Sequence, residues 1–170
     1  TDWKGAVFNQ KGLDIPALLA WQKQHGTVEG FTGGEPLSNE DLFGLDVDVL
    51  VPAALENQIT EENAGKVRAK IVTEGANGPT TPEAHRIMHA NGVFVIPDIL
   101  ANSGGVTTSY FEWVQDRHGY FWEEAEVNQK LEKKMCAAFD AVLQTATKYK
   151  VDMRTAAYIV AIDRVGTVTK

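Results

Sequence analysis

The sequence has 170 residues, of which only one is cysteine, and it contains no long apolar run. Cys136 therefore has no internal disulfide partner, and its position among helix-forming residues predicts a buried thiol in a reducing compartment, the cytoplasm. The longest apolar stretches, near Val47–Leu55 and Val93–Ile96, are far shorter than the roughly 20 residues that cross a membrane. No basic segment followed by an apolar stretch opens the chain. We expect neither a membrane partner nor a secretory signal.

Basic residues are also scarce. The chain carries 16 Lys and Arg residues against 23 Asp and Glu residues, a formal net charge of -7. Because binding to a phosphate backbone needs a cationic surface, this balance argues against nucleic acid as a partner. The 44% of hydrophobic residues fits a soluble globular domain and excludes disordered and fibrous classes. A small molecule is the expected ligand.

The glycine-rich fingerprint G-x-G-x-x-G is absent as well. The nearest glycine pairs, Gly33-Gly34 and Gly104-Gly105, lack its spacing and its preceding strand. A dinucleotide-binding domain without this phosphate turn is incomplete. Any such domain here would lack its first strand and glycine-rich turn.

Residues 1–103 alternate short β-branched runs with amphipathic segments, which indicates βα units around a parallel sheet. The predicted strands are Val47–Val51, Ala69–Thr73 and Val93–Ile96, with Gly5–Asn9 as a weaker candidate. The predicted fold class is therefore α/β, a partial Rossmann-like doubly wound parallel sheet. Residues 1–103 would form a partial dinucleotide-binding domain.

Helix boundaries can be predicted from capping residues. Ser38, Thr60 and Thr81 are expected to begin helices, and Gly26 is expected to end the helix Ile15–His25. Asn91-Gly92 should end the helix that follows Thr81. After Asn102 the pattern is helical only, with predicted segments Gly105–Arg117, Trp122–Tyr149 and 152–170. Small residues at helical spacing in the second of these predict core packing: Ala137, Ala138, Ala141, Val142 and Ala146.

Two glycine-containing turns follow successive predicted strands and are the best candidates for a ligand site. Residues 74–79 bring Asn77 directly after one strand, and Asn102 precedes Gly104-Gly105 after the next. Open α/β sheets bind ligands beyond the carboxyl ends of their strands. Asn77 and Asn102 can both donate and accept hydrogen bonds, although either turn could also be an ordinary connection.

Four further residues could complete such a site. Ser109 and Val106 lie in the first turns of the helix that Gly105 opens, where a hydroxyl could hold one oxygen of an acidic substrate. Ala53 and Ala54 end another strand with small side chains that suit a flat ring or a ribose. Tight packing for the alanines and solvent exposure for the serine are the alternatives.

Asp2 and two other groups have competing interpretations. An acid such as Asp2, after the end of a strand, accepts hydrogen bonds from ribose hydroxyls in dinucleotide folds, but alone it is a surface aspartate. His85 and His89 could share a metal, yet no third ligand is near in the sequence, so we predict a solvated helix face and no metal site. Six aromatic residues are expected in the core rather than in a stacking surface: Tyr110, Phe111, Trp113, Tyr120, Phe121 and Trp122.

Two long strings, residues 70–84 (KIVTEGANGPTTPEA) and 96–113 (IPDILANSGGVTTSYFEW), closely resemble the signature of the hexameric glutamate dehydrogenases. Weaker similarity extends from Asp2 to Arg154-Thr-Ala-Ala-Tyr158, hence over nearly the whole chain. The resemblance is to the C-terminal, coenzyme-binding part of that family, which also contains dehydrogenases of other amino acids.

The resemblance implies roles for the candidate residues. Asn77 and Asn102 would face the nicotinamide ribose and carboxamide, Ala53 and Ala54 would line the groove, and Asp2 would meet the adenosine ribose. Ser109 would bind the side-chain carboxylate of L-glutamate or 2-oxoglutarate, with Val106 against the methylenes. The implied coenzyme is NAD, with NADP as the alternative because Lys4 could offset Asp2.

The resemblance also implies what this chain does not contain. The family's catalytic lysine and aspartate belong to a separate substrate domain, so we expect no catalytic residue in residues 1–170 and no activity from this chain alone. Residues 104–170 would complete the coenzyme domain and reach back toward that domain. The full-length protein is expected to be a homo-oligomer. The alternatives are a related amino acid dehydrogenase and a non-catalytic dinucleotide-binding or regulatory domain.

Overall fold

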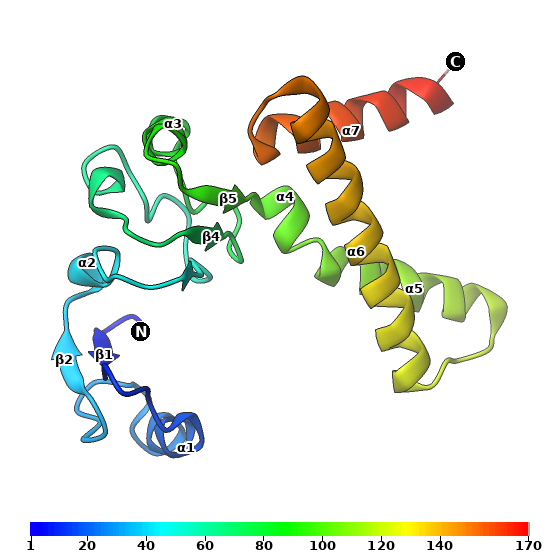
Figure 1. Ribbon diagram of the computed structural model, residues 1–170. Coiled ribbons are helices and arrows are strands. Elements are labelled where there is room, and N and C mark those ends of the chain that lie inside the picture. The colour runs from blue at the N-terminus through cyan, green and yellow to red at the C-terminus, as the bar shows by residue number, and fades with distance from the viewer. Residues whose placement is uncertain (170) are drawn as a thin grey trace.

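The structure is a computed structural model that describes residues 1–169, with strands in its first half and long helices in its second (Figure 1). The first half contains β1 (Ala6–Phe8), α1 (Ile15–His25), β2 (Glu35–Leu37), α2 (Asn39–Leu42), β3 (Val49–Leu50), a 3-10 helix (Ala64–Lys66), β4 (Ile71–Thr73), α3 (Pro82–Ala90), β5 (Phe94–Ile96) and α4 (Asp98–Ala101). The second half contains α5 (Gly104–His118), α6 (Glu124–Tyr149) and α7 (Met153–Val168). The predicted α/β class is confirmed.

Strands β3, β4 and β5 form a parallel sheet in that order. Val72 of the central strand β4 lies opposite Leu50 on one side and Val95 on the other. All three strands were predicted. Strands β3 and β4 begin two residues later than predicted, and β5 begins one residue later. Because the three strands run in one direction, the turns that follow them meet at one edge of the sheet.

Strand β1 does not belong to this sheet, so the prediction of a single parallel sheet for residues 1–103 was wrong there. It pairs antiparallel with β2, with Val7 opposite Pro36, in a separate two-stranded sheet. Strand β2 was not predicted, because Glu35-Pro36-Leu37 has neither β-branched residues nor alternation. This N-terminal unit has a small core of Val7, Val28 and Phe31, against which α1 packs.

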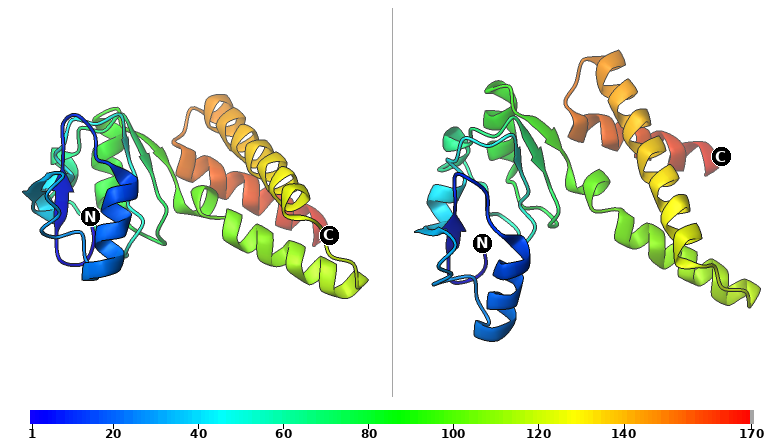
Figure 2. Two further views of the ribbon diagram at one scale, coloured as in Figure 1. Left: turned by 90° about the horizontal axis from the view of Figure 1, so that it is seen from below. Right: turned by 60° about the horizontal axis from the view of Figure 1, so that its bottom comes forward.

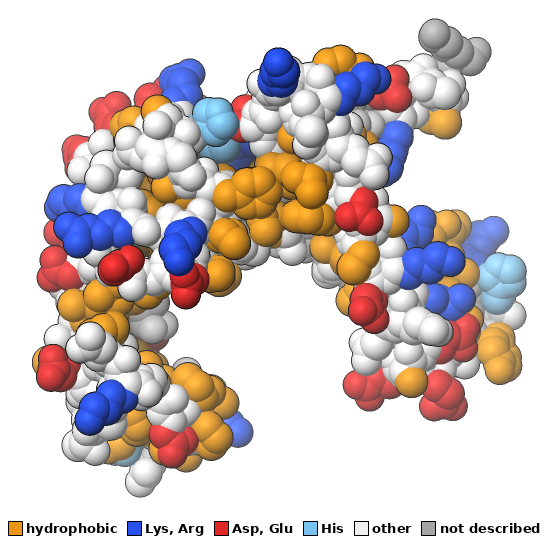
Figure 3. All heavy atoms as spheres, viewed as in Figure 1, with side chains coloured by type: hydrophobic (Ala, Val, Ile, Leu, Met, Phe, Trp, Pro, Cys, Tyr) orange, Lys and Arg blue, Asp and Glu red, His pale blue; other side chains and the backbone are white. Residues whose placement is uncertain are grey.

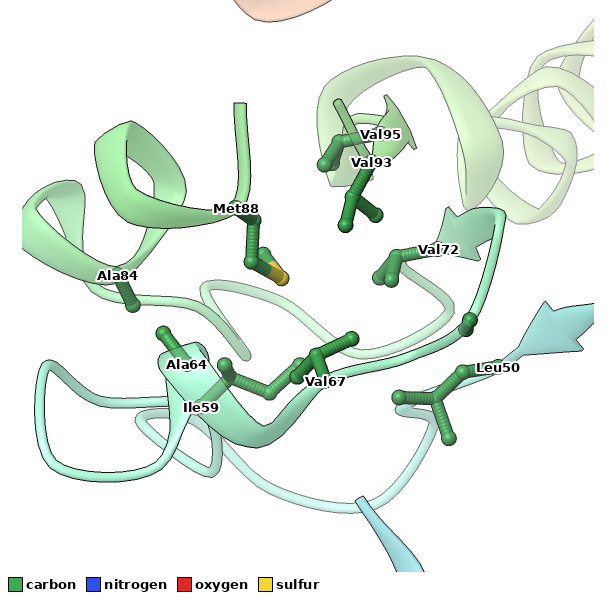
Figure 4. Close-up of a cluster of buried hydrophobic side chains, with 10 residues drawn as sticks. Leu50, Ile59, Ala64, Val67, Val72, Ala84, Met88, Val93 and Val95 are labelled. Atoms are coloured by element: carbon green, nitrogen blue, oxygen red, sulfur yellow. The ribbon is translucent and has the colours of Figure 1, made fainter. Parts of the chain in front are cut away.

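The parallel sheet is held by a core of aliphatic side chains that converge from the strands, the 3-10 helix and α3 (Figure 4). Val72, Ile59 and Met88 are completely buried at its centre. Burial of such a side chain contributes about 1.5 to 3 kcal/mol relative to exposure. This core fixes the strand ends, and therefore the turns that follow them.

Most helix boundaries follow their predicted caps. The side chains of Ser38 and Thr81 accept hydrogen bonds from backbone N–H groups of α2 and α3, and Gly26 ends α1 in the left-handed conformation. Thr60 does not begin an α-helix. Its N–H donates to the side chain of Asn63 at 2.8 Å, and the chain then makes only the short 3-10 helix. A side chain that bonds locally to the backbone competes with helix formation.

Helix α4 joins the sheet to the helical half, where α6 packs against both α5 and α7 (Figure 2). Leu100 of α4 lies in a second core with Val142, Met153, Ala156 and Ala157. Of the predicted small-residue stripe on α6, Val142 is buried and Ala138, Ala141 and Ala146 are half-buried, whereas Ala137 is exposed. No helix within residues 1–169 is long and apolar enough to cross a membrane.

Predictions about burial failed at several positions. Cys136 is exposed, not buried. Among the six aromatic residues only Phe111 is buried, with Trp122 half-buried against it, while Tyr120 and Phe121 are 71% and 68% exposed. The pattern of an apolar helix face is the same whether its own domain or another surface covers it, so spacing could not decide between the two.

Candidate functional site

The turns after β3 and β4 are in direct contact at the carboxyl edge of the sheet. The N–H groups of Gly75 and Ala76 both donate to the carbonyl of Pro52 at 3.0 Å. A β-carbon on Gly75 would lie 3.0 Å from that of Ala53, so the close approach of the two turns requires glycine there. Ala53 and Ala54 are exposed beside this contact.

Asn77 and Asn102, predicted from turns 25 residues apart, lie side by side. The Asn102 Nδ2 donates to Asn77 Oδ1 at 2.7 Å and to the Ala76 carbonyl at 3.3 Å. Within residues 1–169, the Asn77 Nδ2 and the Asn102 Oδ1 make no hydrogen bond. The pair therefore offers one free donor and one free acceptor at the sheet edge.

An ionic cluster that the sequence analysis missed lies behind the asparagine pair. Glu74, completely buried at the end of β4, accepts hydrogen bonds from Arg154 Nη2 at 2.6 and 2.5 Å. The Arg154 Nη1 donates to Asp98 Oδ1 at 3.0 Å. The available signal was an acidic residue within two positions of the end of each of two strands, which is unusual for positions this close to a core.

The pKa values of Asp98 and Arg154 favour the charged forms of these two residues. Partial burial opposes ionisation of Asp98, but hydrogen bonds from the Gly78 and Ile99 N–H groups and the Arg154 charge outweigh it and lower the pKa of Asp98. Burial likewise opposes the charge on Arg154, but its contacts with Glu74 and Asp98 raise its pKa. The guanidinium thus stays charged between its two carboxylates.

Ser109 and Val106 lie on α5, which begins at Gly104 close to the predicted start. Both side chains are exposed, Val106 by 70%. The Ser109 hydroxyl donates to the carbonyl of Gly105 at 3.1 Å. The serine is accessible to a ligand, but its proton already has an acceptor within the helix.

Asp2 lies in the N-terminal unit, where its carboxylate holds two loops together. Its Oδ1 accepts hydrogen bonds from the Lys4 N–H at 2.9 Å and the Thr27 hydroxyl at 3.2 Å, and its Oδ2 accepts one from the Val28 N–H at 2.7 Å. Partial burial opposes its ionisation, but these hydrogen bonds lower the pKa of Asp2. Of its two oxygens, Oδ2 has more room for a further donor.

The prediction of a solvated face for His85 and His89 was wrong for His85. His85 is buried, and its Nε2 lies 3.0 Å from Asp152 Oδ1 at the start of α7, whereas His89 is exposed. This contact could not be predicted from the sequence because the two residues are 67 positions apart. Among residues 1–169, no three His, Cys, Asp or Glu side chains are placed to hold a metal ion.

A sequence model of the Glutamate/Leucine/Phenylalanine/Valine dehydrogenase family matches residues 1–170. The chain belongs to this family. As a member of it, the chain is 55% identical over 170 residues to the glutamate dehydrogenase of Thermotoga maritima, covering all of this chain and 41% of that protein. It is 53% identical over 164 residues to an NAD-specific glutamate dehydrogenase of Staphylococcus aureus, covering 96% of this chain and 39% of that protein.

Solved structures of family members have the same fold. The hetero-hexameric glutamate dehydrogenase of Thermus thermophilus in its leucine-bound form superimposes with a TM-score of 0.87 at 34% identity, over 94% of this chain and 38% of that one. The chain therefore spans about two fifths of the length of these relatives. The match includes every candidate site residue, because it extends over the whole sequence.

Proposed function

We propose that this chain is the coenzyme-binding part of a longer, NAD-dependent glutamate dehydrogenase, which converts L-glutamate, water and NAD+ reversibly to 2-oxoglutarate, ammonium, NADH and a proton. The observation that carries the proposal is the Asn77–Asn102 pair at the carboxyl edge of a parallel sheet. The family match and the names of the relatives at 55% and 53% identity support the reaction.

The free groups of the asparagine pair fit the nicotinamide carboxamide. That carboxamide has an NH2 group and a carbonyl, and the pair offers an acceptor on Asn102 and a donor on Asn77. The exposed Ala53 and Ala54 leave space for the adjoining ribose. When bound, NAD supplies the carbon that accepts the hydride, and the asparagines orient the ring by hydrogen bonding.

Ser109 and Val106 are proposed to bind the substrate. To hold the glutamate side-chain carboxylate, Ser109 would turn its proton away from the Gly105 carbonyl. Because the Gly105 carbonyl already accepts this proton, an apolar substrate would not leave the hydroxyl unpaired, and the cost of about 1 to 3 kcal/mol for an unpaired buried hydroxyl does not exclude such a substrate. The choice of glutamate over leucine therefore rests on the names of the relatives.

NAD is the proposed coenzyme and NADP the alternative. Asp2 keeps a charged oxygen that would repel a 2′-phosphate. Lys4, which could have offset it, lies 3.8 Å from Glu29 in an ion pair. We further propose that the full-length protein is a cytoplasmic homo-oligomer, and the hexameric state of the Thermus relative makes a hexamer our expectation.

The test is reduction of NAD by the purified full-length protein with glutamate and with leucine as substrates. We expect glutamate-dependent formation of NADH, slower reduction of NADP, and no activity from residues 1–170 alone. Comparable turnover of leucine would favour a related amino acid dehydrogenase. Binding of NADH without turnover of any amino acid would favour a regulatory domain.

A further inference from the structure

Arg154 links helix α7 to both turns that carry the proposed coenzyme ligands. Its Nη2 contacts both oxygens of Glu74, after β4, and its Nη1 contacts Asp98, after β5. The Arg154 side chain is only 21% exposed, and that of Glu74 is 0% exposed. One largely buried guanidinium therefore contacts two carboxylates that follow neighbouring strands.

The two carboxylates also hold each other's turns. The Asp98 N–H donates to Glu74 Oε2 at 2.9 Å, and the Gly78 N–H donates to Asp98 Oδ2 at 2.8 Å. Gly78 has a φ of +56°, a conformation that glycine adopts at low cost. Each turn is thus bonded to the acid of the other, and both acids are bonded to Arg154.

The asparagine pair lies within this network of hydrogen bonds between the two turns. Asn77 is flanked by Glu74 and Gly78, both of which are fixed by the cluster. Asn102 ends helix α4, and its N–H donates to the carbonyl of Asp98 at 3.0 Å. The 2.7 Å contact between the two asparagines therefore depends on the relative position of Glu74 and Asp98.

We infer that Arg154 is a positioning residue for the coenzyme: through Glu74 and Asp98 it sets the spacing of Asn77 and Asn102. This inference rests on the proposed coenzyme site. Without the guanidinium, the carboxylates of Glu74 and Asp98, which follow neighbouring strands, would repel each other and move the two turns apart. The planar fork of arginine reaches both acids at once, whereas the ammonium of lysine is a single point charge.

The test compares Arg154→Met, Arg154→Lys and Asp98→Asn in the full-length protein, with Arg86→Met as the control. Arg86 forms an exposed ion pair with Glu83 at 2.7 Å on α3, away from the turns. We expect Arg154→Met to raise the KM for NAD at least tenfold and the KM for glutamate less than threefold, with Arg154→Lys recovering part of the loss. Asp98→Asn, which keeps its shape, should raise the KM for NAD about threefold, and Arg86→Met should change neither constant.

Hydrogen exchange supplies a readout independent of turnover. In Arg154→Met, the amides of residues 74–78 should exchange faster, while those of α1 should not change. An NAD KM within twofold of the wild type in a folded Arg154→Met variant would overturn the inference, as would equal increases in both KM values. If Arg154→Met does not fold, the same comparison of the KM for NAD with the KM for glutamate is made with Arg154→Lys and Asp98→Asn.

Failure of the proposed function gives a different result. If the wild-type protein does not oxidise glutamate, NADH binding followed by fluorescence replaces the KM in the same comparison, and at least tenfold weaker binding by Arg154→Met still supports the inference. A wild-type protein that does not bind NADH would overturn both.

Discussion

The two ends of the proposed coenzyme groove hold their polar side chains in different ways. At the N-terminal end, Asp2 is held by backbone N–H groups and a hydroxyl of its own small unit. At the sheet edge, Asn77 and Asn102 contact each other and are backed by the ion pair between the buried Glu74 and the largely buried Arg154. The Asp2 carboxylate holds loops together through hydrogen bonds, whereas the asparagine pair keeps a free donor and a free acceptor.

At the sheet edge, the groups that support the turns are different from the groups that are proposed to bind the coenzyme. The supporting groups at the sheet edge are charged and largely buried, and they leave the neutral amides in front of them available. Apolar surface gathers at the centre of the view in Figure 3, over β5 and α4. At the N-terminal end, the single carboxylate of Asp2 would have to hold its loops together and also bind the coenzyme. Substitutions behind the asparagines should therefore lower both stability and coenzyme binding, whereas substitutions of the asparagines should affect binding more than stability.

Glu74→Gln should give the largest effect, on stability. It leaves Arg154 buried with one carboxylate instead of two, and loss of one partner from a buried ion pair costs about 3 to 5 kcal/mol. We expect a loss of about 3 kcal/mol in the free energy of unfolding measured in urea. The control is Glu83→Gln, whose ion pair with Arg86 is exposed, with an expected change below about 0.5 kcal/mol. Equal losses would contradict the buried role of Glu74.

Asp152 gives the next effect, and it depends on pH. Burial opposes its ionisation, but Thr155 and His85 lower the pKa of Asp152 from 3.8 to about 2. Its stabilisation is therefore complete above pH 3.8 and is lost as the pH falls through about 2. Asp152→Asn should lower the free energy of unfolding by about 2 kcal/mol at neutral pH, since each pKa unit corresponds to about 1.4 kcal/mol.

The difference between wild type and Asp152→Asn should shrink in urea titrations as the pH falls from about 4 toward 2. The control is Asp14→Asn, because Asp14 caps α1 through Ala17 and asparagine caps helices about equally well. A difference that stays constant with pH would show that the charge of Asp152 contributes nothing.

Asn77→Ala and Asn102→Ala should change coenzyme affinity more than stability. Each removes one hydrogen bond to the carboxamide, worth about 0.5 to 1.5 kcal/mol, so the dissociation constant of NADH should rise about three- to tenfold. In the double variant, the dissociation constant of NADH should rise by less than the product of the two single increases, because the two residues contact each other. Asn128→Ala on the exposed face of α6 is the control. Unchanged NADH binding in both single variants would remove the asparagines from the site.

Asp2→Asn should give the smallest effect on the coenzyme, about a threefold rise in the KM for NAD, because the Oδ2 retains room for one ribose hydroxyl. Thr27→Val is the matched variant, since it removes one hydrogen bond from Asp2 but keeps its charge. Thr27→Val should lower the melting temperature without changing this KM. If both variants raise the KM equally, Asp2 acts only through the fold of its loop.

The sequence predicted the parts of the fold that local patterns determine. The strands of the parallel sheet and the caps Ser38, Thr81 and Gly26 follow from short runs of residues whose preferences agree with the final structure. The short strand β2 was missed because its pairing with β1 is decided by tertiary contacts and not by its own residues.

The same division applies to the candidate site. Asn77 and Asn102 could be predicted because each follows a strand, and parallel strands bring such positions together. Arg154 could not, because it is 80 residues from Glu74 in the sequence and nothing local indicates the pairing. His85 and Asp152 were missed for the same reason.

A crystal structure of the full-length protein with NAD+ bound would test the proposed site most directly. We predict that the nicotinamide carboxamide lies within hydrogen-bonding distance, about 3 Å, of the Asn77 Nδ2 and the Asn102 Oδ1, with Ala53 and Ala54 beside the ribose. A nicotinamide bound away from both asparagines would contradict the assignment.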